Sequence, residues 1–245
     1  MFAIARKEFS AFFRSSTGSL ILLAYLGLNG IVLWTWRHTS WNLLDSGYAH
    51  LDGLFIVSPM LFLILIPGIG MRMLAEERQR GTMEWLLTQP LTEWQIIMGK
   101  WLAGVALIAL AIAPTLVYAI TIDQLGDPVG ILDMGSTLGA YLGLVMIGAT
   151  YMAISLFASS LTDNVVTALL LSIAGCAAIF WLFDLVSQLA FFRDNSLFWA
   201  QWGMLEHYRS ISRGVLESRD ILYFAGAITV FLSAARLSLQ RRMWS

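Results

Sequence analysis

The sequence of 245 residues contains little charge and only one cysteine. Charged residues make up 13% of the chain, hydrophobic residues make up 58%, and the mean hydropathy is +0.72. This composition is too apolar for a soluble domain of this length and indicates an integral membrane protein. Cys176 stands alone in an apolar run, which excludes an intramolecular disulfide and makes a cysteine-based metal site implausible. The 15 basic and 16 acidic residues give no indication of nucleic-acid binding.

Motifs of enzymes and pumps are also missing. Gly99-Lys100 is followed by Trp101 and has no glycine five positions earlier, so the sequence offers no P-loop for ATP. Neither Gly-x-Ser-x-Gly nor His-Glu-x-x-His occurs, which argues against intramembrane hydrolysis. The central apolar spans carry no ionisable residue of the kind that ion-coupled carriers bury. We therefore expect no enzymatic activity, no metal site and no cofactor in this chain itself.

Six charge-free windows predict six membrane-spanning helices in one all-α domain over residues 1–245. Five windows contain 18 to 29 residues, and a helix needs about 20 residues to cross the hydrocarbon of a bilayer. The sixth, Ile221 to Ala235, has 15 residues and crosses only if Arg236 snorkels and residues 237–239 extend it. The expected spans cover about 18–36, 54–74, 97–122, 136–160, 164–188 and 220–239.

Residues 1–15 predict an amphipathic helix that lies in the membrane interface. Phe2, Phe9 and Phe13 recur at helical spacing, while Arg6 and Arg14 occupy the other face. The basic residues before the first apolar run resemble a signal-peptide n-region. That run ends without a small-x-small cleavage site, so we expect an uncleaved first span.

The distribution of basic residues predicts the orientation. Six spans place both termini on one side, and ten of the 15 basic residues then fall on that side. The positive-inside rule favours cytoplasmic termini. Four of the five outer basic residues lie between spans five and six, which weakens this argument locally.

A polar island over residues 72–100 separates the second and third spans and is predicted to form a cytoplasmic coupling loop at 75–96. Gly81 allows a turn, residues 82–88 can form a short surface helix, and Pro90 ends it. Thr92 and Gln95 form a capping box that predicts a helix start at about Glu93.

The pattern Glu-Glu-x-x-x-Gly-Thr-x-Glu-x-Leu-Leu-x-x-Pro at residues 76–90, followed by Gly99-Lys100, resembles the cytoplasmic loop of the second ABC transporter permease superfamily, the type V exporter fold. The gliding-motility-associated branch is the most similar, and the run from His207 to Asp220 supports that branch. In this family the loop carries the coupling helix that docks on a separate ATP-binding subunit. The residues that the resemblance assigns to coupling are Glu76, Glu77, Arg78, Arg80, Gly81, Thr82, Met83, Glu84, Leu86, Leu87 and Pro90.

Within that assignment an electrostatic collar would be formed by Glu76, Glu77, Arg78 and Arg80, with Gly81 as its hinge. Met83, Leu86 and Leu87 would form an apolar docking face, which ends at Pro90. The resemblance also implies a dimer with a second permease copy or paralogue, with ATP and Mg²⁺ bound by the partner subunit. It implies a place in the bacterial inner membrane and allows an accessory subunit on the outer side. Members of the superfamily move lipids, polysaccharides and drugs, and the apolar spans favour a hydrophobic or amphipathic cargo.

The connector over residues 189–219 is unusually aromatic, which favours short helices that dip into the outer interface. In the resembling family this position holds re-entrant helices. Asp220 is expected to be the N-cap of the last span.

Small residues and prolines within the spans give cues to packing. Gly135, Gly139 and Gly143 recur every four residues and predict a helix-packing face. Pro59, Pro67 and Pro114 fall within spans two and three, where a kink for a moving pathway and ordinary transmembrane proline are equally good readings.

Two other functional classes fit the same topology. A membrane scaffold or assembly subunit would use the fold without moving cargo, and nucleotide-dependent conformational change in the complex would distinguish it from an exporter. A secondary carrier is disfavoured because the spans lack buried charge. An adjacent gene for an ATP-binding subunit would argue against that carrier.

Overall fold

The computed structural model describes residues 1–36, 39, 41–45, 48–83, 92–127, 130–188, 199 and 201–243. All regular elements within these residues are helices, and six of them are long and apolar enough to cross a membrane. They run over Gly18–Thr35, Asp52–Gln79, Glu93–Leu125, Met134–Leu161, Val165–Gln188 and Ser218–Gln240. The predicted all-α fold with six spans is thereby confirmed.

The first two spans follow an N-terminal helix. That helix is α1 (Phe2–Arg14), which leads into α2 (Ser16–Gly30) and a π-helical turn at Ile31–Thr35. Span two is α3 (Asp52–Met71), which continues through a second π-helical segment, η2 (Arg72–Glu76), into the short helix α4 (Glu77–Gln79).

The other spans complete the bundle. Span three consists of α6 (Glu93–Ile112), a 3-10 turn (Ala113–Thr115) and α7 (Leu116–Leu125). Spans four and five are α8 (Met134–Leu161) and α9 (Val165–Gln188). The short helix α11 (Met204–Ser212) precedes span six, α12 (Ser218–Met243).

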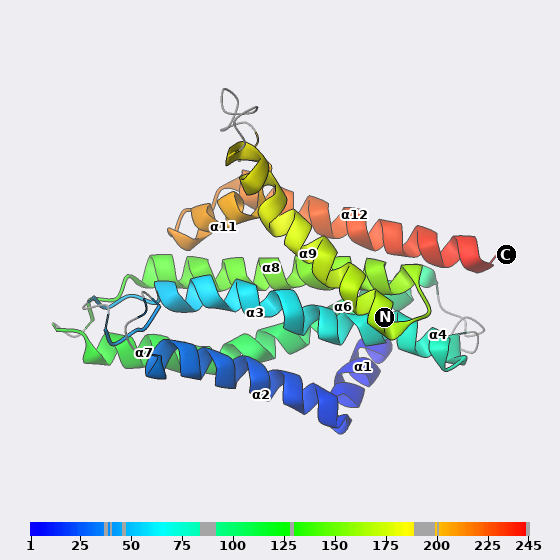
Figure 1. Ribbon diagram of the computed structural model, residues 1–245, viewed down its shortest axis with the longest axis horizontal. Coiled ribbons are helices and arrows are strands. Elements are labelled where there is room, and N and C mark those ends of the chain that lie inside the picture. Colours follow the sequence, from blue (N-terminus) through cyan, green and yellow to red (C-terminus); the bar gives the residue numbers. More distant parts are fainter. Residues whose placement is uncertain are drawn as a thin grey trace.

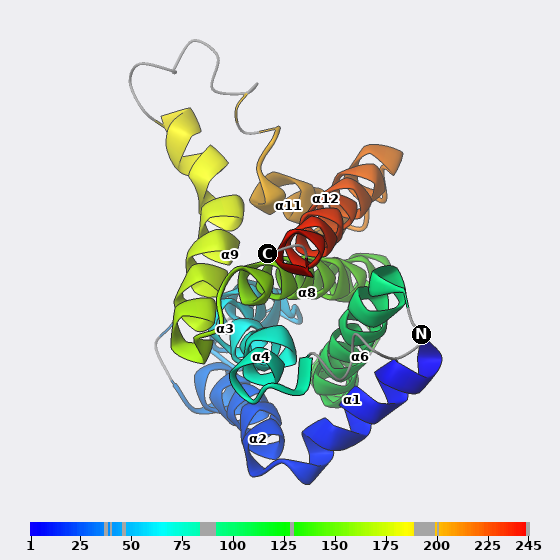
Figure 2. The same cartoon turned by 90° about the vertical axis from the view of Figure 1, so that its right-hand side faces the viewer.

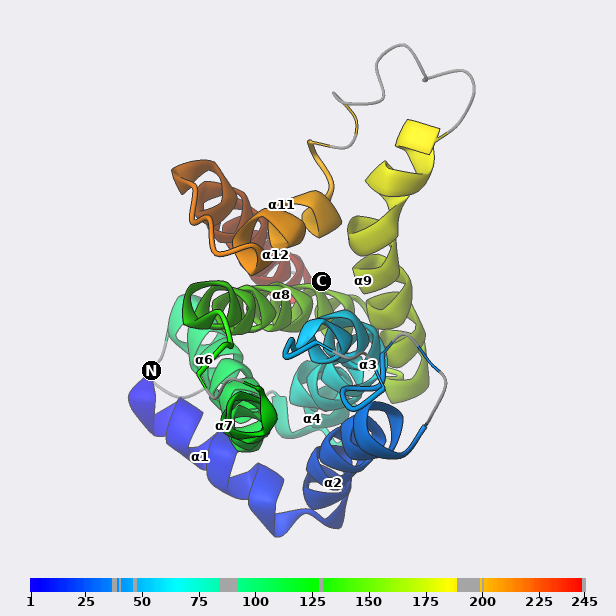
Figure 3. The ribbon, with the colours of Figure 1, turned by 90° about the vertical axis from the view of Figure 1, so that its left-hand side faces the viewer.

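Helix α8 is the centre of the bundle, and it contacts α3, α6, α9, α11 and α12. In its membrane-spanning window 78% of the residues are buried, against 17% to 61% in the other five spans. Small residues allow this close approach, since an added Cβ at Gly148 would lie 2.7 Å from Ile108 of α6. The view along the bundle shows α8 between α11 and α12 on one side and α3 and α6 on the other (Figure 3).

The prolines of the spans have different effects. Pro59 and Pro67 lie within α3, which stays continuous past both. Pro114 lies in the 3-10 turn between α6 and α7, where the α-helical hydrogen-bond pattern is interrupted. Proline therefore interrupts the third span only.

Both termini and α4 lie at the same end of the bundle, on the right in Figure 1. Helix α1 crosses this end and contacts α2 and α6 (Figure 2). Ile4 is buried there, and a Cβ at Gly99 of α6 would lie 2.9 Å from the Ile4 Cβ. The N-terminal helix is thus packed on the ends of the spans, with Phe2 and Phe13 exposed on its outer side.

Candidate coupling segment

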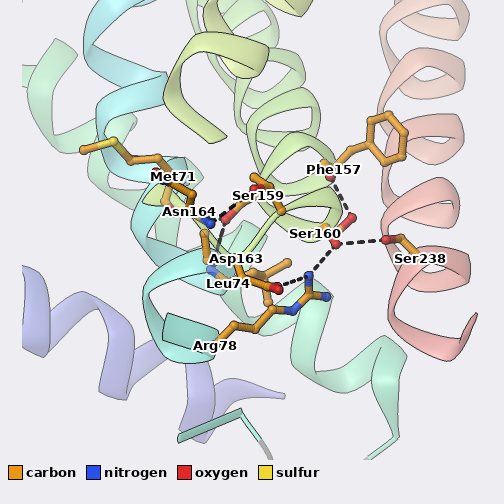
Figure 4. Close-up of polar contacts among 11 residues, drawn as sticks. Met71, Leu74, Arg78, Phe157, Ser159, Ser160, Asp163, Asn164 and Ser238 are labelled. Carbon is orange, nitrogen blue, oxygen red and sulfur yellow. Dashed lines mark hydrogen bonds and ion pairs between the residues drawn. The ribbon is translucent and has the colours of Figure 1, made fainter. Parts of the chain in front are cut away.

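The segment that leaves span two is held by a serine of span four (Figure 4). The π-helical segment η2 does not follow the regular α-helical hydrogen-bond pattern. The Ser159 hydroxyl donates to the Met71 carbonyl oxygen at 3.0 Å and accepts from the amides of Leu74 and Ala75 at 3.3 and 2.9 Å. Ser159 therefore satisfies backbone groups at the point where the helix changes pitch.

Arg78 attaches the next turn to the end of span four. Its guanidinium donates to the Ser160 carbonyl oxygen at 2.6 Å and lies 3.6 Å from a carboxylate oxygen of Asp163. The Ser238 hydroxyl of α12 donates to the same Ser160 oxygen at 2.9 Å. The start of the loop, the end of α8 and the end of α12 therefore meet at one carbonyl group (Figure 4).

Lys100 of α6 makes the most buried ionic contact of the segment. Its side chain is 0% exposed, and its ammonium group lies 2.8 Å from the Glu8 carboxylate of α1 and 2.9 Å from the Glu77 carboxylate of α4. A charge removed from water to this extent is tolerated only with close counter-ions, which the two carboxylates supply. We refer to Glu8, Lys100 and Glu77 as the buried triad. It joins the N-terminal helix, span three and the coupling segment.

The far end of the loop is tied to span six. Thr92 and Gln95 form the predicted capping box, and α6 begins at Glu93 as expected. The Glu93 carboxylate accepts hydrogen bonds from Arg236 at 3.2 Å and from Gln240 at 2.9 Å. Both ends of the loop are thereby anchored in the bundle by polar contacts.

The charges of the predicted collar have intramolecular partners. Glu76 pairs with Arg80 at 2.6 Å, Glu77 belongs to the buried triad, and Arg78 binds the end of α8. Gly81 has φ of +68°, a left-handed conformation that favours glycine, so the predicted turn is present.

The apolar docking face is described only in part. Thr82 donates its hydroxyl to the Glu77 carbonyl oxygen at 3.1 Å. Met83 is only 5% exposed and belongs to the core, so its apolar side chain packs inside the described part of the chain. Glu84, Leu86, Leu87 and Pro90 lie outside the described residues.

The predicted glycine face contacts α11. A Cβ at Gly139 would lie 2.5 Å from the Ile211 carbonyl oxygen, and one at Gly143 would lie 2.9 Å from the Tyr208 ring. A Cβ at Gly135 would contact only the carboxylate of Asp133, which caps the same helix. Gly139 and Gly143 are therefore the close-contact positions of this face.

At the opposite end of the bundle, Asp220 is not the N-cap of the last span. Helix α12 begins at Ser218, so Asp220 lies within its first turn. Its side chain is fully buried and lies 2.7 Å from the His207 imidazole of α11. The prediction failed because the carboxylate has a tertiary partner, which competes with capping.

Beside this pair, Tyr208 donates to the Phe55 carbonyl oxygen at 2.8 Å. Burial raises the pKa of Tyr208 well above its ordinary value of 10.

Several anchoring residues were missed by sequence reasoning. The sequence patterns place Lys100 at the end of the polar island over residues 72–100, and they assign no role to Glu8 or Ser159. The only available signal was the isolation of Lys100 at the start of an apolar run, where a charge needs a partner. The sequence could not show which carboxylates would reach it.

The family assignment agrees with this architecture of six spans and an anchored loop. Residues 2–193 match the model of the ABC-2 family transporter protein, which covers more than half of the chain. The chain therefore belongs to the ABC-2 transporter family. The match is to the family as a whole and does not distinguish the gliding-motility-associated branch.

Curated relatives match over a shorter stretch. The chain is 36% identical over 120 residues to the probable multidrug ABC transporter permease YbhR of Escherichia coli K12, and the same values hold for YbhR of E. coli O157:H7. The alignment covers 47% of this chain and 31% of each relative. The chain thus matches about a third of the length of these relatives.

Proposed function

We propose that this chain is the transmembrane permease subunit of an ATP-driven exporter in a bacterial inner membrane. It would form the translocation path with a second copy or a paralogue, and a separate ATP-binding subunit would bind ATP and Mg²⁺. Membership of the ABC-2 family and similarity to probable multidrug permeases support this proposal. The apolar spans of this chain favour a hydrophobic or amphipathic cargo.

The observation that carries the coupling role is the anchoring of the segment after span two. Arg78 connects it to spans four and six, and the buried triad connects it to α1 and span three. A displacement of residues 76–90 by an ATP-binding subunit would therefore be transmitted to several helices at once. In this mechanism the ion pairs and hydrogen bonds of Glu76, Glu77, Arg78 and Arg80 hold the coupling segment rigid. Leu86 and Leu87 provide the apolar contact with the ATP-binding subunit.

Co-purification tests the docking role. The tagged chain is isolated from its native host in mild detergent, and the proteins recovered with it are identified by mass spectrometry. Wild type should recover an ATP-binding subunit, while Leu86→Asp with Leu87→Asp should lose it because two carboxylates oppose apolar docking. The control is Thr162→Asp with Asn164→Asp, which adds the same charge at the same end where Asp preserves the local capping contacts.

The outcomes are distinct. Retention of the ATP-binding subunit by the Leu86/Leu87 variant would remove these residues from the docking face. Recovery of a complex without any ATP-binding subunit by wild type would favour a scaffold or a secondary carrier.

Cysteine labelling tests the proposed cytoplasmic location of this end. Cys176 is fully buried, so the native chain should react little with the maleimide, while Gln79 is exposed. A membrane-impermeant maleimide should label Gln79→Cys only after the cells are opened. Glu217→Cys, which is exposed at the opposite end, should react in intact cells. The reverse pattern would invert the topology and contradict coupling through this segment.

A further inference from the structure

A cavity of about 610 Å³ opens at the end of the bundle that holds both termini and α4. It lies between α1, the start of α2, the end of α3 with η2 and α4, and α6. This volume is within the range of small-molecule binding sites. We call it the interfacial cavity, because it lies where the charged helix ends meet the apolar spans.

The interfacial cavity is apolar on the side of the spans. Ile21 of α2, Ile69 of α3 and Leu107 of α6 line it there, together with Gly68. The same three large residues also line a narrow apolar seam that runs deeper between these helices, beside Phe62. The cavity therefore becomes apolar toward the interior of the membrane-spanning bundle, as an amphiphile would require.

Two cations that line the cavity come from α1 and η2. Lys7 of α1 is exposed and Arg72 of η2 is half-buried, and neither makes an ion pair or side-chain hydrogen bond within the described part of the chain. Arg80 also lines the cavity, but it is paired with Glu76. Lys7 and Arg72 are therefore the cations available to a ligand.

Carboxylates on the wall are held by other groups. Glu76 is neutralised by Arg80, and Glu8 and Glu77 share the ammonium group of Lys100 behind the wall. The three basic and three acidic residues that line the cavity balance, and Lys100 behind the wall brings the net charge around the cavity to about +1 at neutral pH. The environment thus favours an anionic headgroup beside the two free cations.

We propose that the interfacial cavity binds an anionic phospholipid. Its phosphate lies against Lys7 and Arg72, and one acyl chain lies on Ile21, Ile69 and Leu107. A phosphodiester with attached hydrocarbon satisfies both sides of the cavity, and the adjoining leaflet supplies it. The binding site depends only on the membrane location of the chain and is independent of the ATP-binding partner.

The test uses the full chain in nanodiscs of phosphatidylcholine that contain graded amounts of phosphatidylglycerol, followed by native mass spectrometry of the retained lipid. Lys7→Gln with Arg72→Gln removes the two free cations. A basic residue near a lipid surface contributes about five-fold in affinity, so this variant should bind phosphatidylglycerol roughly 30-fold more weakly. The matched control, Arg6→Gln with Arg14→Gln, removes two exposed cations of α1 that do not line the cavity, and it should retain the lipid.

A steric variant tests the apolar side without changing charge. A Cβ at Gly68 would lie 3.8 Å from Ile21, an ordinary contact, so the larger side chain of Gly68→Leu would occupy the apolar part of the cavity. It should also lose the retained phosphatidylglycerol, while its monodisperse elution in size-exclusion chromatography reports folding. Inorganic phosphate at millimolar concentration should not displace the lipid.

Three results would overturn the proposal. Equal retention of phosphatidylcholine and phosphatidylglycerol by wild type would exclude recognition of the anion. Equal losses in the cavity variant and its control would show general surface attraction only. Displacement by inorganic phosphate, together with full retention by Gly68→Leu, would show a site for free phosphate rather than for a lipid.

Discussion

Replacing Lys100 by methionine should release the N-terminal helix from the bundle. Methionine has a similar volume but no charge, so the carboxylates of Glu8 and Glu77 would lose the ammonium group that lies within 2.9 Å of both. Two like charges would then face one another beside the apolar end of α6. The simplest relief is movement of α1, which carries Glu8 away into water.

The size of the effect follows from the burial of the triad. Removing one partner of a buried ion pair typically costs about 3 to 5 kcal/mol, because the remaining charge is left uncompensated. The Glu8 and Glu77 side chains are 19% and 20% exposed, so water reaches them and the lower value applies. A cost of about 3 kcal/mol raises the undocked fraction of α1 roughly 100-fold.

Hydrogen exchange of the α1 amides in nanodiscs measures this equilibrium directly. The Lys100→Met variant should exchange roughly 100-fold faster over residues 2–14 than wild type, with little change in α8. The control is the triple variant Glu8→Gln, Glu77→Gln and Lys100→Met. It removes all three charges, and replacing a complete buried ionic group is often close to neutral. The triple variant should therefore recover most of the protection.

Two results would refute this reasoning. Exchange of α1 in Lys100→Met within about three-fold of wild type would show that the triad contributes little to docking. Exchange in the triple variant as fast as in the single variant would show that the lysine acts through packing of its carbon chain.

Three further predictions concern α8 and α11. Gly139→Ala should lower stability by about 1 to 3 kcal/mol in thermal unfolding, because its Cβ would meet a backbone oxygen of α11, whereas Gly135→Ala should be tolerated; equal melting temperatures would contradict the packing face. Ser159→Ala should lower the free energy of unfolding by about 1 to 3 kcal/mol and speed hydrogen exchange of the amides over residues 72–76. Unchanged exchange there would be evidence that the Ser159 hydroxyl does not hold this segment. The raised pKa of Tyr208 means that its stabilising contribution is complete below about pH 10 and is lost as the pH rises through the folded pKa. Wild type should therefore lose thermal stability more steeply than Tyr208→Phe between about pH 9 and pH 12, and parallel curves would refute this.

The helical architecture was accessible from sequence because its causes are local. The apolar windows predict six spans, and the capping box at Thr92 and Gln95 predicts the start of α6, because both depend on residues within a few positions of one another. The turn at Gly81 was predicted for the same reason. Length and hydropathy carry no information on how the spans pack.

The pairing of polar groups could not be predicted in this way. Asp220 has the residue type and position of an N-cap, yet its buried carboxylate contacts His207 of a different helix. Met83 follows the pattern of an exposed apolar face, yet it is buried in the core. The same local sequence pattern fits a capping or a buried aspartate, and an exposed or a buried methionine. Only the positions of the neighbouring helices distinguish these alternatives.

Hydropathy and helix length along the chain were enough to predict an integral membrane protein with six spans. These properties follow from hydrophobicity and helix geometry along a single chain. How the helices pack determines that Lys100 joins α1 to the coupling segment and that Ser159 holds the π-helical segment η2. The physical reason is that a buried charge or backbone group must find a partner, and that partner is set by which helices lie within about 3 Å of it.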